Sequence, residues 1–142
     1  MIRIASVAAA LLLTAAPAFA QSADNKVVLT FETGARTGMV MVALYDSASA
    51  FDGGSARPVA ATAVSASGSR VVATFENLPA GDYAMKAFHD VNGDGEMNTN
   101  PFGMPVEPYA FSNNAVGNMG PARWSAAHFA VSGETTQTIS IR

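Results

Sequence analysis

The chain contains no cysteine among its 142 residues and only two histidines. Disulfide bonds, thiol catalysis and a closed structural zinc site are therefore excluded. Charged residues are scarce at 13%, and the net charge of −3 comes with no basic cluster. Nucleic acid is therefore not expected as a partner. A chain of this size can still bury enough apolar surface to fold as one domain without disulfides.

Long apolar runs are also rare, and the one that stands out lies at the N-terminus. A basic residue precedes a nearly all-apolar stretch at 4–15, and residues 18–20 (AFA) have the small-x-small pattern of a cleavage site. This combination predicts a cleaved signal peptide at 1–20, a single domain at 21–142, and a periplasmic or secreted location. The apolar stretch is shorter than the about 20 residues of a membrane-spanning helix, so no membrane span is expected.

Alternation of apolar and polar residues recurs along the rest of the chain, which is typical of half-buried strands. The expected strands are 26–33, 39–46, 58–66, 69–77, 83–89, 124–131 and 135–141. About seven short strands, separated by turn residues and without a clear helix, predict an all-β fold. A two-sheet sandwich is the default architecture at this length.

The connection over 90–123 shows neither the strand period nor the helix period. Such a long loop inside a compact domain is uncommon and is usually functional or disordered. It carries many large apolar residues, which a solvated linker would lack. We therefore expect a long ordered excursion that packs back onto the sandwich.

The run HDVNGDGEMNTNP at 89–101 opens this excursion. Its alternating side-chain oxygens and its turn at Gly95 suit a hard cation such as calcium. Pro101 stands where an EF-hand loop has its bidentate glutamate, and no helix pattern flanks the run, so a true EF-hand is rejected. The alternative is that the Asn-Gly and Asp-Gly pairs simply form turns at a hairpin tip. The candidate calcium ligands are Asp90, Asn92, Asp94, Glu96, Asn98 and Glu107.

Several segments resemble the bacterial exported family known as domain of unknown function 2141. They are HDVNGDG (89–95), GMPVE (103–107), FSNN (111–114), GPARW (120–124) and AHF (127–129). The resemblance covers nearly all of the chain after the signal peptide. It implies an Ig-like or prealbumin-like β-sandwich, and it implies no activity.

The polar residues of the FSNN segment have two interpretations. Ser112, Asn113 and Asn114 can bind a ligand, but such side chains more often cross-link loops through hydrogen bonds to backbone groups. The structural interpretation is the favoured one.

The histidines and methionines offer a further metal site. His89 and His128, together with Met97, Met104 and Met119, have the imidazole and thioether ligands that suit copper. No close spacing supports such a site, and packing of the methionines in the core is favoured. His89 and its neighbour in the run are expected to point to opposite faces of a strand.

No GxSxG, HExxH or P-loop motif occurs. The sequence therefore favours a non-enzymatic exported module, binding or structural, in the cell envelope, with an envelope protein or a glycan as the expected kind of partner. The alternative is a carbohydrate- or peptide-binding domain that uses the aromatic side chains of Phe102, Tyr109 and Trp124. A hydrolase would need a histidine beside Ser112.

Overall fold

The computed structural model describes residues 24–34, 37–53 and 55–142. The predicted signal peptide at 1–20 lies outside these residues. The strands are β1 (Asn25–Glu32), β2 (Met39–Tyr45), β3 (Ala60–Ser65), β4 (Arg70–Leu78), β5 (Gly81–Asp90), β6 (Tyr109–Phe111), β7 (Phe129–Val131) and β8 (Glu134–Ser140). The helical segments are α1 (Ala48–Phe51), the 3₁₀ turn η1 (Ser112–Asn114) and α2 (Trp124–Ala127).

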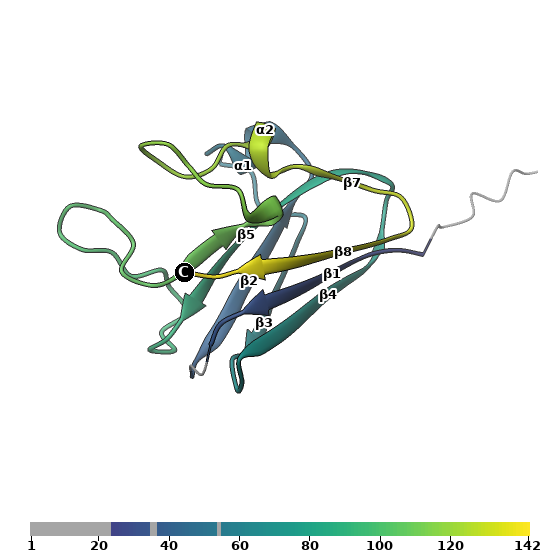
Figure 1. The fold of residues 1–142 in the computed structure, drawn as a ribbon. Helices are drawn as coiled ribbons and strands as arrows, with labels where there is room; N and C mark the ends of the chain where they lie inside the picture. Colours follow the sequence, from purple (N-terminus) through teal and green to yellow (C-terminus); the bar gives the residue numbers. More distant parts are fainter. Residues whose placement is uncertain (1–23, 35–36, 54) are drawn as a thin grey trace, which may run out of the picture.

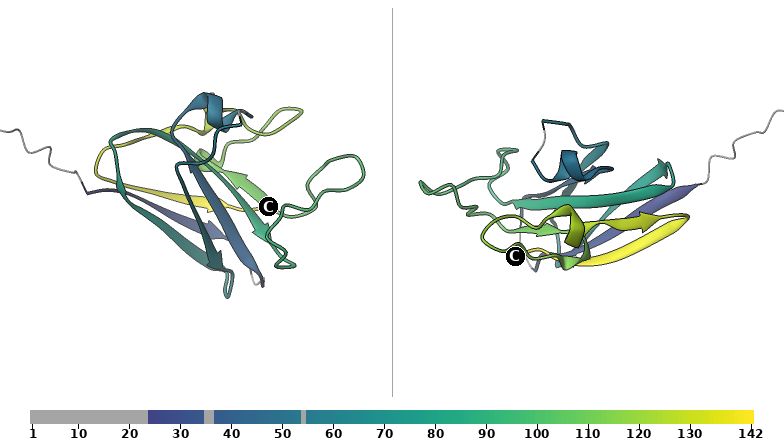
Figure 2. Two further views of the ribbon diagram at one scale, coloured as in Figure 1. Left: turned by 180° about the vertical axis from the view of Figure 1, so that it is seen from behind. Right: turned by 90° about the horizontal axis from the view of Figure 1, so that it is seen from above.

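The strands form two sheets that pack face to face (Figure 1). A three-stranded sheet has the order β4-β1-β8, and a five-stranded sheet has the order β3-β2-β5-β6, with β7 also paired to β5. The pairing of β1 with β8 is parallel, and the other pairings are antiparallel. The views in Figure 2 show the same layered arrangement from behind and from above. The two-sheet sandwich is therefore confirmed, while the Ig-like or prealbumin-like type stays a prediction.

The core lies between the sheets and follows the alternation in the sequence. β1 and β2 bury every second residue, so that each contributes one apolar face to the interior. Burial of one such Val, Leu or Phe side chain contributes about 1.5–3 kcal/mol relative to leaving it exposed. The largest fully buried apolar side chains between the sheets include Phe31, Leu29, Leu44, Met85 and Ile139.

The corner between β4 and β5 is fixed by a tyrosine. The Tyr83 hydroxyl donates a hydrogen bond to the Pro79 carbonyl at 2.7 Å. Burial raises the pKa of this phenol, which keeps the donated proton in place. The resulting corner aligns β5, the strand that leads into the long excursion.

Three predictions about secondary structure are wrong. The expected strand at 124–131 begins instead with helix α2, because the backbone N–H groups of Ala126 and Ala127 both bond to the Arg123 carbonyl. The sequence predicts no strand in the region 90–123, yet this region contains β6 and the turn η1. The expectation of no clear helix is also wrong, because α1 forms. None of the helices in the described part of the chain is long and apolar enough to cross a membrane.

Candidate functional site

β6 divides the predicted excursion at 90–123 in two. From here on, the excursion means residues 91–108, which leave the sheet after β5 and return to it at β6. Asp90 lies at its start and is 1% exposed. Its carboxylate accepts hydrogen bonds from the backbone N–H groups of Gly93 at 2.7 Å, Asp94 at 3.2 Å and Gly95 at 2.8 Å. The turn is possible because Gly93 and Gly95 have φ values of 75° and 80°, which favour glycine. Asp90 therefore organises the first turn of the excursion.

Glu107 closes the excursion from its other end. This side chain is buried, and its carboxylate accepts from the Val91 N–H at 2.9 Å and from the Asn98 N–H at 3.1 Å. The His89 N–H also donates to the Pro108 carbonyl at 2.8 Å. The two ends of the excursion are thus joined side by side at a neck, which we define by Asp90 and Glu107.

The other candidate ligands form an exposed corner beside the neck. The Asn92 side-chain amide donates to Asp94 at 3.1 Å and to Asn98 at 2.8 Å, and the Asn98 amide donates to Asp94 at 2.9 Å. These contacts define the corner triad of Asn92, Asp94 and Asn98. Glu96 lies exposed beside it, and its backbone N–H donates to the Asp94 carboxylate at 2.9 Å.

Hydrogen bonds to the Asp94 carboxylate favour its ionised form. Its pKa is lowered from 3.8 by the Asn98 side chain, then by the Glu96 backbone N–H, with a smaller contribution from Asn92. A lowered folded-state pKa means that the associated stabilisation is present above the unfolded-state pKa. It is lost as the pH falls through the lower, folded-state pKa.

The six predicted calcium ligands take part in different hydrogen-bond networks. The carboxylates of Asp90 and Glu107 already accept backbone N–H groups, while Asp94 belongs to the exposed triad. Within residues 24–34, 37–53 and 55–142, no group of three or more His, Cys, Asp or Glu side chains is placed to hold a metal ion. Calcium binding by these six residues stays a prediction.

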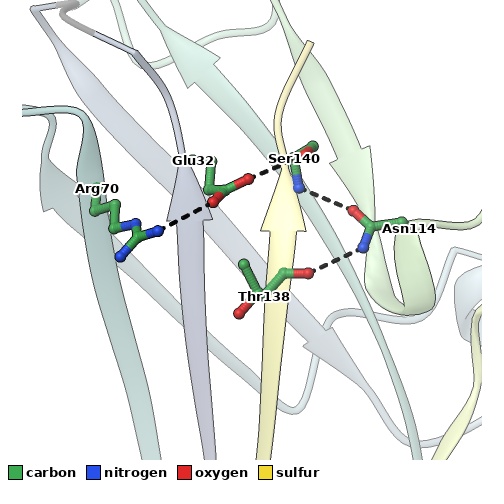
Figure 3. Close-up of polar contacts among 5 residues, drawn as sticks. All are labelled: Glu32, Arg70, Asn114, Thr138 and Ser140. Atoms are coloured by element: carbon green, nitrogen blue, oxygen red, sulfur yellow. Dashed lines mark hydrogen bonds and ion pairs between the residues drawn. The ribbon is translucent and has the colours of Figure 1, made fainter.

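The FSNN segment joins the two sheets, as Figure 3 shows for Asn114. The Asn114 side-chain N–H donates to the Thr138 carbonyl at 2.9 Å, and its side-chain oxygen accepts from the Ser140 N–H at 2.8 Å. These two bonds satisfy backbone groups of β8 that a neighbouring strand would otherwise pair with. The Ser140 hydroxyl contacts Glu32 at 3.4 Å, and Glu32 pairs with Arg70 at 3.5 Å, so the polar contacts cross from β8 to β1 and β4. This arrangement covers an edge of β8 that could otherwise pair with another chain.

Asn113, which precedes Asn114 in the turn η1, also links this turn to neighbouring segments through hydrogen bonds. Its backbone N–H donates to Gln137 at 2.7 Å, and its amide donates to the carbonyls of Ala126 and His128 at 3.2 and 2.9 Å. Asn113 and Asn114 have φ values of 59° and 50°, a conformation that asparagine adopts more readily than most residues. Both asparagines therefore act on backbone groups, as the structural interpretation expects.

Among the described residues, Ser112 and the two histidines lie in different surroundings. The Ser112 hydroxyl is buried, donates to the Ala127 carbonyl at 2.6 Å and accepts from the Met85 N–H at 2.9 Å. His89 faces the core, where its Nε2 contacts the Thr37 carbonyl. His128 is exposed and stacks on Trp124, with ring centroids 5.7 Å apart. Neither histidine is a hydrogen-bond partner of Ser112 in the described residues.

A hollow lies on the outer face of the five-stranded sheet. In β2 and β5, Met41 lies opposite Phe88 and Ala43 lies opposite Lys86, alternating with residues of the core. These outward residues form the floor of a groove of about 1130 Å³. Its walls come from the excursion and from residues 115–123, which we call the second loop. Figures 1 and 2 show both loops extending from the same side of the sandwich.

We call this hollow the outer groove. Its apolar walls include Met97, Met104 and Pro105 of the excursion, and Met119 and Pro121 of the second loop. The packing of Met97, Met104 and Met119 in the core is therefore a wrong prediction, because all three are exposed and line the groove.

The histidines do not join these methionines, so the predicted copper set is not brought together. His89 and His128 are both absent from the lining of the outer groove in the described part of the chain.

The three aromatic residues of the predicted binding surface are also separated. Tyr109 borders the outer groove, whereas Trp124 packs against Phe51 with ring centroids 6.1 Å apart. Phe102 lies at the tip of the excursion and is 89% exposed. Only Tyr109 of the three lines the groove formed by the described residues.

Sequence reasoning did not identify Lys86, Met41 or Phe88 as site residues. One signal was available, since the run MVMVALY at 39–45 is apolar on both faces. A strand of that kind is expected to be covered on both sides. Here the second face is the floor of the outer groove.

Comparison with known families gives one match to this chain. The model of a family described as "Uncharacterized protein conserved in bacteria (DUF2141)" matches residues 32–140. No curated protein and no solved structure matches the chain. The matched region contains the neck, the corner triad and all of the outer groove.

Proposed function

The chain belongs to the uncharacterised bacterial family DUF2141, and from this premise we propose that it is an exported, non-enzymatic binding module of the cell envelope. The outer groove is the binding site of this module. Its ligand is an apolar small molecule or an apolar polypeptide segment. The observation that carries this proposal is the gathering of exposed apolar side chains on the two loops that flank the groove. The signal-peptide pattern at 1–20 supports export.

Single exposed apolar residues are common on soluble proteins, but contiguous apolar patches mark interaction sites. The exposed large apolar residues lie mainly on the excursion and the second loop: Met97, Phe102, Met104, Val106, Val116 and Met119. Met119 is fully exposed and has a φ of 55°, a backbone conformation that is uncommon for a residue other than glycine. The chain thus holds a large apolar side chain in water at the rim of the groove.

The neck supports this function by fixing one wall of the groove. Asp90 and Glu107 hold the base of the excursion through backbone hydrogen bonds. A second link within the excursion comes from Asn100, whose side chain accepts from the N–H groups of Phe102 and Met104. A wall that is ordered before binding loses less conformational entropy when the ligand arrives.

A blocking substitution tests the groove. Ala43 lies on the groove floor, so Ala43→Phe is expected to fill it without altering the core between the sheets. We expect saturable binding of 1-decanol to the parent protein by calorimetry, and at least about tenfold weaker binding to the variant, a change of about 1.4 kcal/mol. The control is Val72→Phe, which adds a ring at an exposed site on β4 of the other sheet. Equal binding of 1-decanol to all three proteins would contradict the proposal.

Calcium is the second prediction for this region. One carboxylate and two amides form an exposed corner triad, a donor set that suits millimolar affinity. At 10 mM calcium and a Kd of about 1 mM, the expected stabilisation is about 1.4 kcal/mol. Melting curves with calcium and with chelator measure it, and Asp94→Asn should remove the difference. Identical melting temperatures for the parent protein in both buffers would remove calcium from the proposal and leave the groove unaffected.

A further inference from the structure

We propose that the outer groove takes a single-chain aliphatic carboxylate, with its apolar chain along the methionine walls and its carboxylate at Lys86. This inference rests on the proposed function, because it names the ligand class of the same groove. Lys86 is the single charged residue in the groove lining formed by the described residues.

The side chain of Lys86 lies against the aromatic rings of Phe51 and Tyr45 at one end of the groove. Its Nζ lies 4.6 Å from the centroid of the Phe51 ring and 5.2 Å from that of the Tyr45 ring. It also donates a hydrogen bond to the Phe51 carbonyl at the end of α1. An ammonium group has three donors, so further hydrogen bonds to an incoming carboxylate are available.

The ammonium of Lys86 has no ionic partner among the residues that the structure describes. In residues 24–34, 37–53 and 55–142 the ion pairs are Lys26 with Glu134 and Arg70 with Glu32, all on the other sheet. Asp52, the acidic residue that acts on Lys86, accepts instead from the Trp124 N–H at 2.8 Å.

The half-buried position of Lys86 disfavours its charge. Burial lowers the pKa of the Lys86 amine, and the charge of Asp52 offsets this only in part. A partly desolvated cation of this kind is stabilised by an anion that comes with the ligand.

The rest of the lining fits an aliphatic chain better than a sugar. The floor carries Met41 and Phe88, and the walls carry Met97, Met104 and Met119. Besides Lys86, the polar side-chain groups in the lining are the hydroxyls of Tyr45, Thr62 and Tyr109. Methionine side chains are flexible and adapt to irregular apolar ligands. A volume of about 1130 Å³ is slightly above the usual range for small-molecule sites, about 300–1000 Å³, so the groove has room for an extended aliphatic chain. One cation in an otherwise apolar groove is the charge pattern complementary to a fatty-acid-like anion.

A matched pair of ligands tests the role of the ligand's carboxylate separately from that of its aliphatic chain. Sodium decanoate and 1-decanol have the same chain length, and binding of each is followed through the fluorescence of Trp124, the one tryptophan in the chain. Trp124 packs against Phe51, which contacts Lys86, so it reports on the cationic end of the groove. We expect decanoate to bind the parent protein at least tenfold more tightly than 1-decanol.

The Lys86→Gln variant should bind the two ligands with similar affinity, and Lys86→Arg should restore the preference for decanoate. Lys26→Gln is the control, because it removes a lysine from the other sheet. Equal affinity of the parent protein for both ligands would overturn this inference while leaving the proposed function intact. Saturable binding of neither ligand would overturn both. If Lys86→Gln does not fold, as judged by circular dichroism, the ratio measured on the parent protein decides alone.

Discussion

Gly38→Ala is expected to destabilise the fold by about 3–5 kcal/mol. Gly38 has a φ of 91°, which an alanine adopts only with strain. A Cβ atom at this position would also lie 2.1 Å from the Asp90 carbonyl oxygen and 3.0 Å from the Val91 Cα. Both neighbours are backbone atoms, so they can move aside only if the end of β5 shifts. The expected loss is a large share of the 5–15 kcal/mol by which domains are usually stable.

Urea denaturation of Gly38→Ala and Gly68→Ala measures this effect. Gly68 lies in the turn between β3 and β4 and does not have a left-handed φ, and a Cβ atom added there would meet no other atom within 4 Å. Its replacement is expected to change stability by less than about 1 kcal/mol. If the two variants unfold at the same urea concentration, the close packing of Gly38 against the base of the excursion is not important for stability.

Asp90→Ala is expected to cost about 2–4 kcal/mol, because it removes a buried carboxylate that accepts three backbone N–H groups. Asp90→Asn is the more specific change, since it keeps the size of the side chain. It replaces one acceptor oxygen with an NH₂ group that faces a backbone donor. We expect it to be destabilising in the same direction by about 1–3 kcal/mol. Thermal unfolding at neutral pH measures both.

Glu96→Gln is the control for the loss of charge. Glu96 lies in the same turn and is exposed, and its carboxylate makes no hydrogen bond or ion pair with the described residues. Its neutralisation is expected to change stability by less than about 0.5 kcal/mol. An Asp90→Asn protein that is as stable as Glu96→Gln would show that the carboxylate does not hold the neck.

The long strands could be predicted from the sequence because the alternation of apolar and polar residues is a local pattern. Alternation in 26–33 and 69–77 defines a buried face without reference to the rest of the chain, and β1 and β4 form close to those limits. β6 has three residues, too few to show a period, and it forms because Phe88 and Lys86 of β5 pair with it. The helix α2 has four residues (Trp124–Ala127), too few to show the helix period in the sequence.

The chemistry of the neck could be predicted only in part. The sequence identified Asp90 and Glu107 as oxygen donors within one structural unit, but a carboxylate that binds calcium and one that accepts backbone N–H groups have the same signature. The outer groove was not predictable in the same way. Met41, Met97 and Met119 are far apart in the chain, and they line one groove because two loops extend from the same side of the sandwich.

The neck makes the excursion a replaceable unit. Its ends lie on the neighbouring strands β5 and β6, and its base is closed by the carboxylates of Asp90 and Glu107. Lengthening a loop whose ends are already joined is cheap, about 0.6 kcal/mol for each doubling of its length. The segment beyond the Thr99–Pro105 bridge can therefore be exchanged for a different sequence while the sandwich stays unchanged. For protein engineering, the sandwich is a scaffold and the tip of the excursion is a graft site. A different sequence grafted there would give the outer groove a different wall.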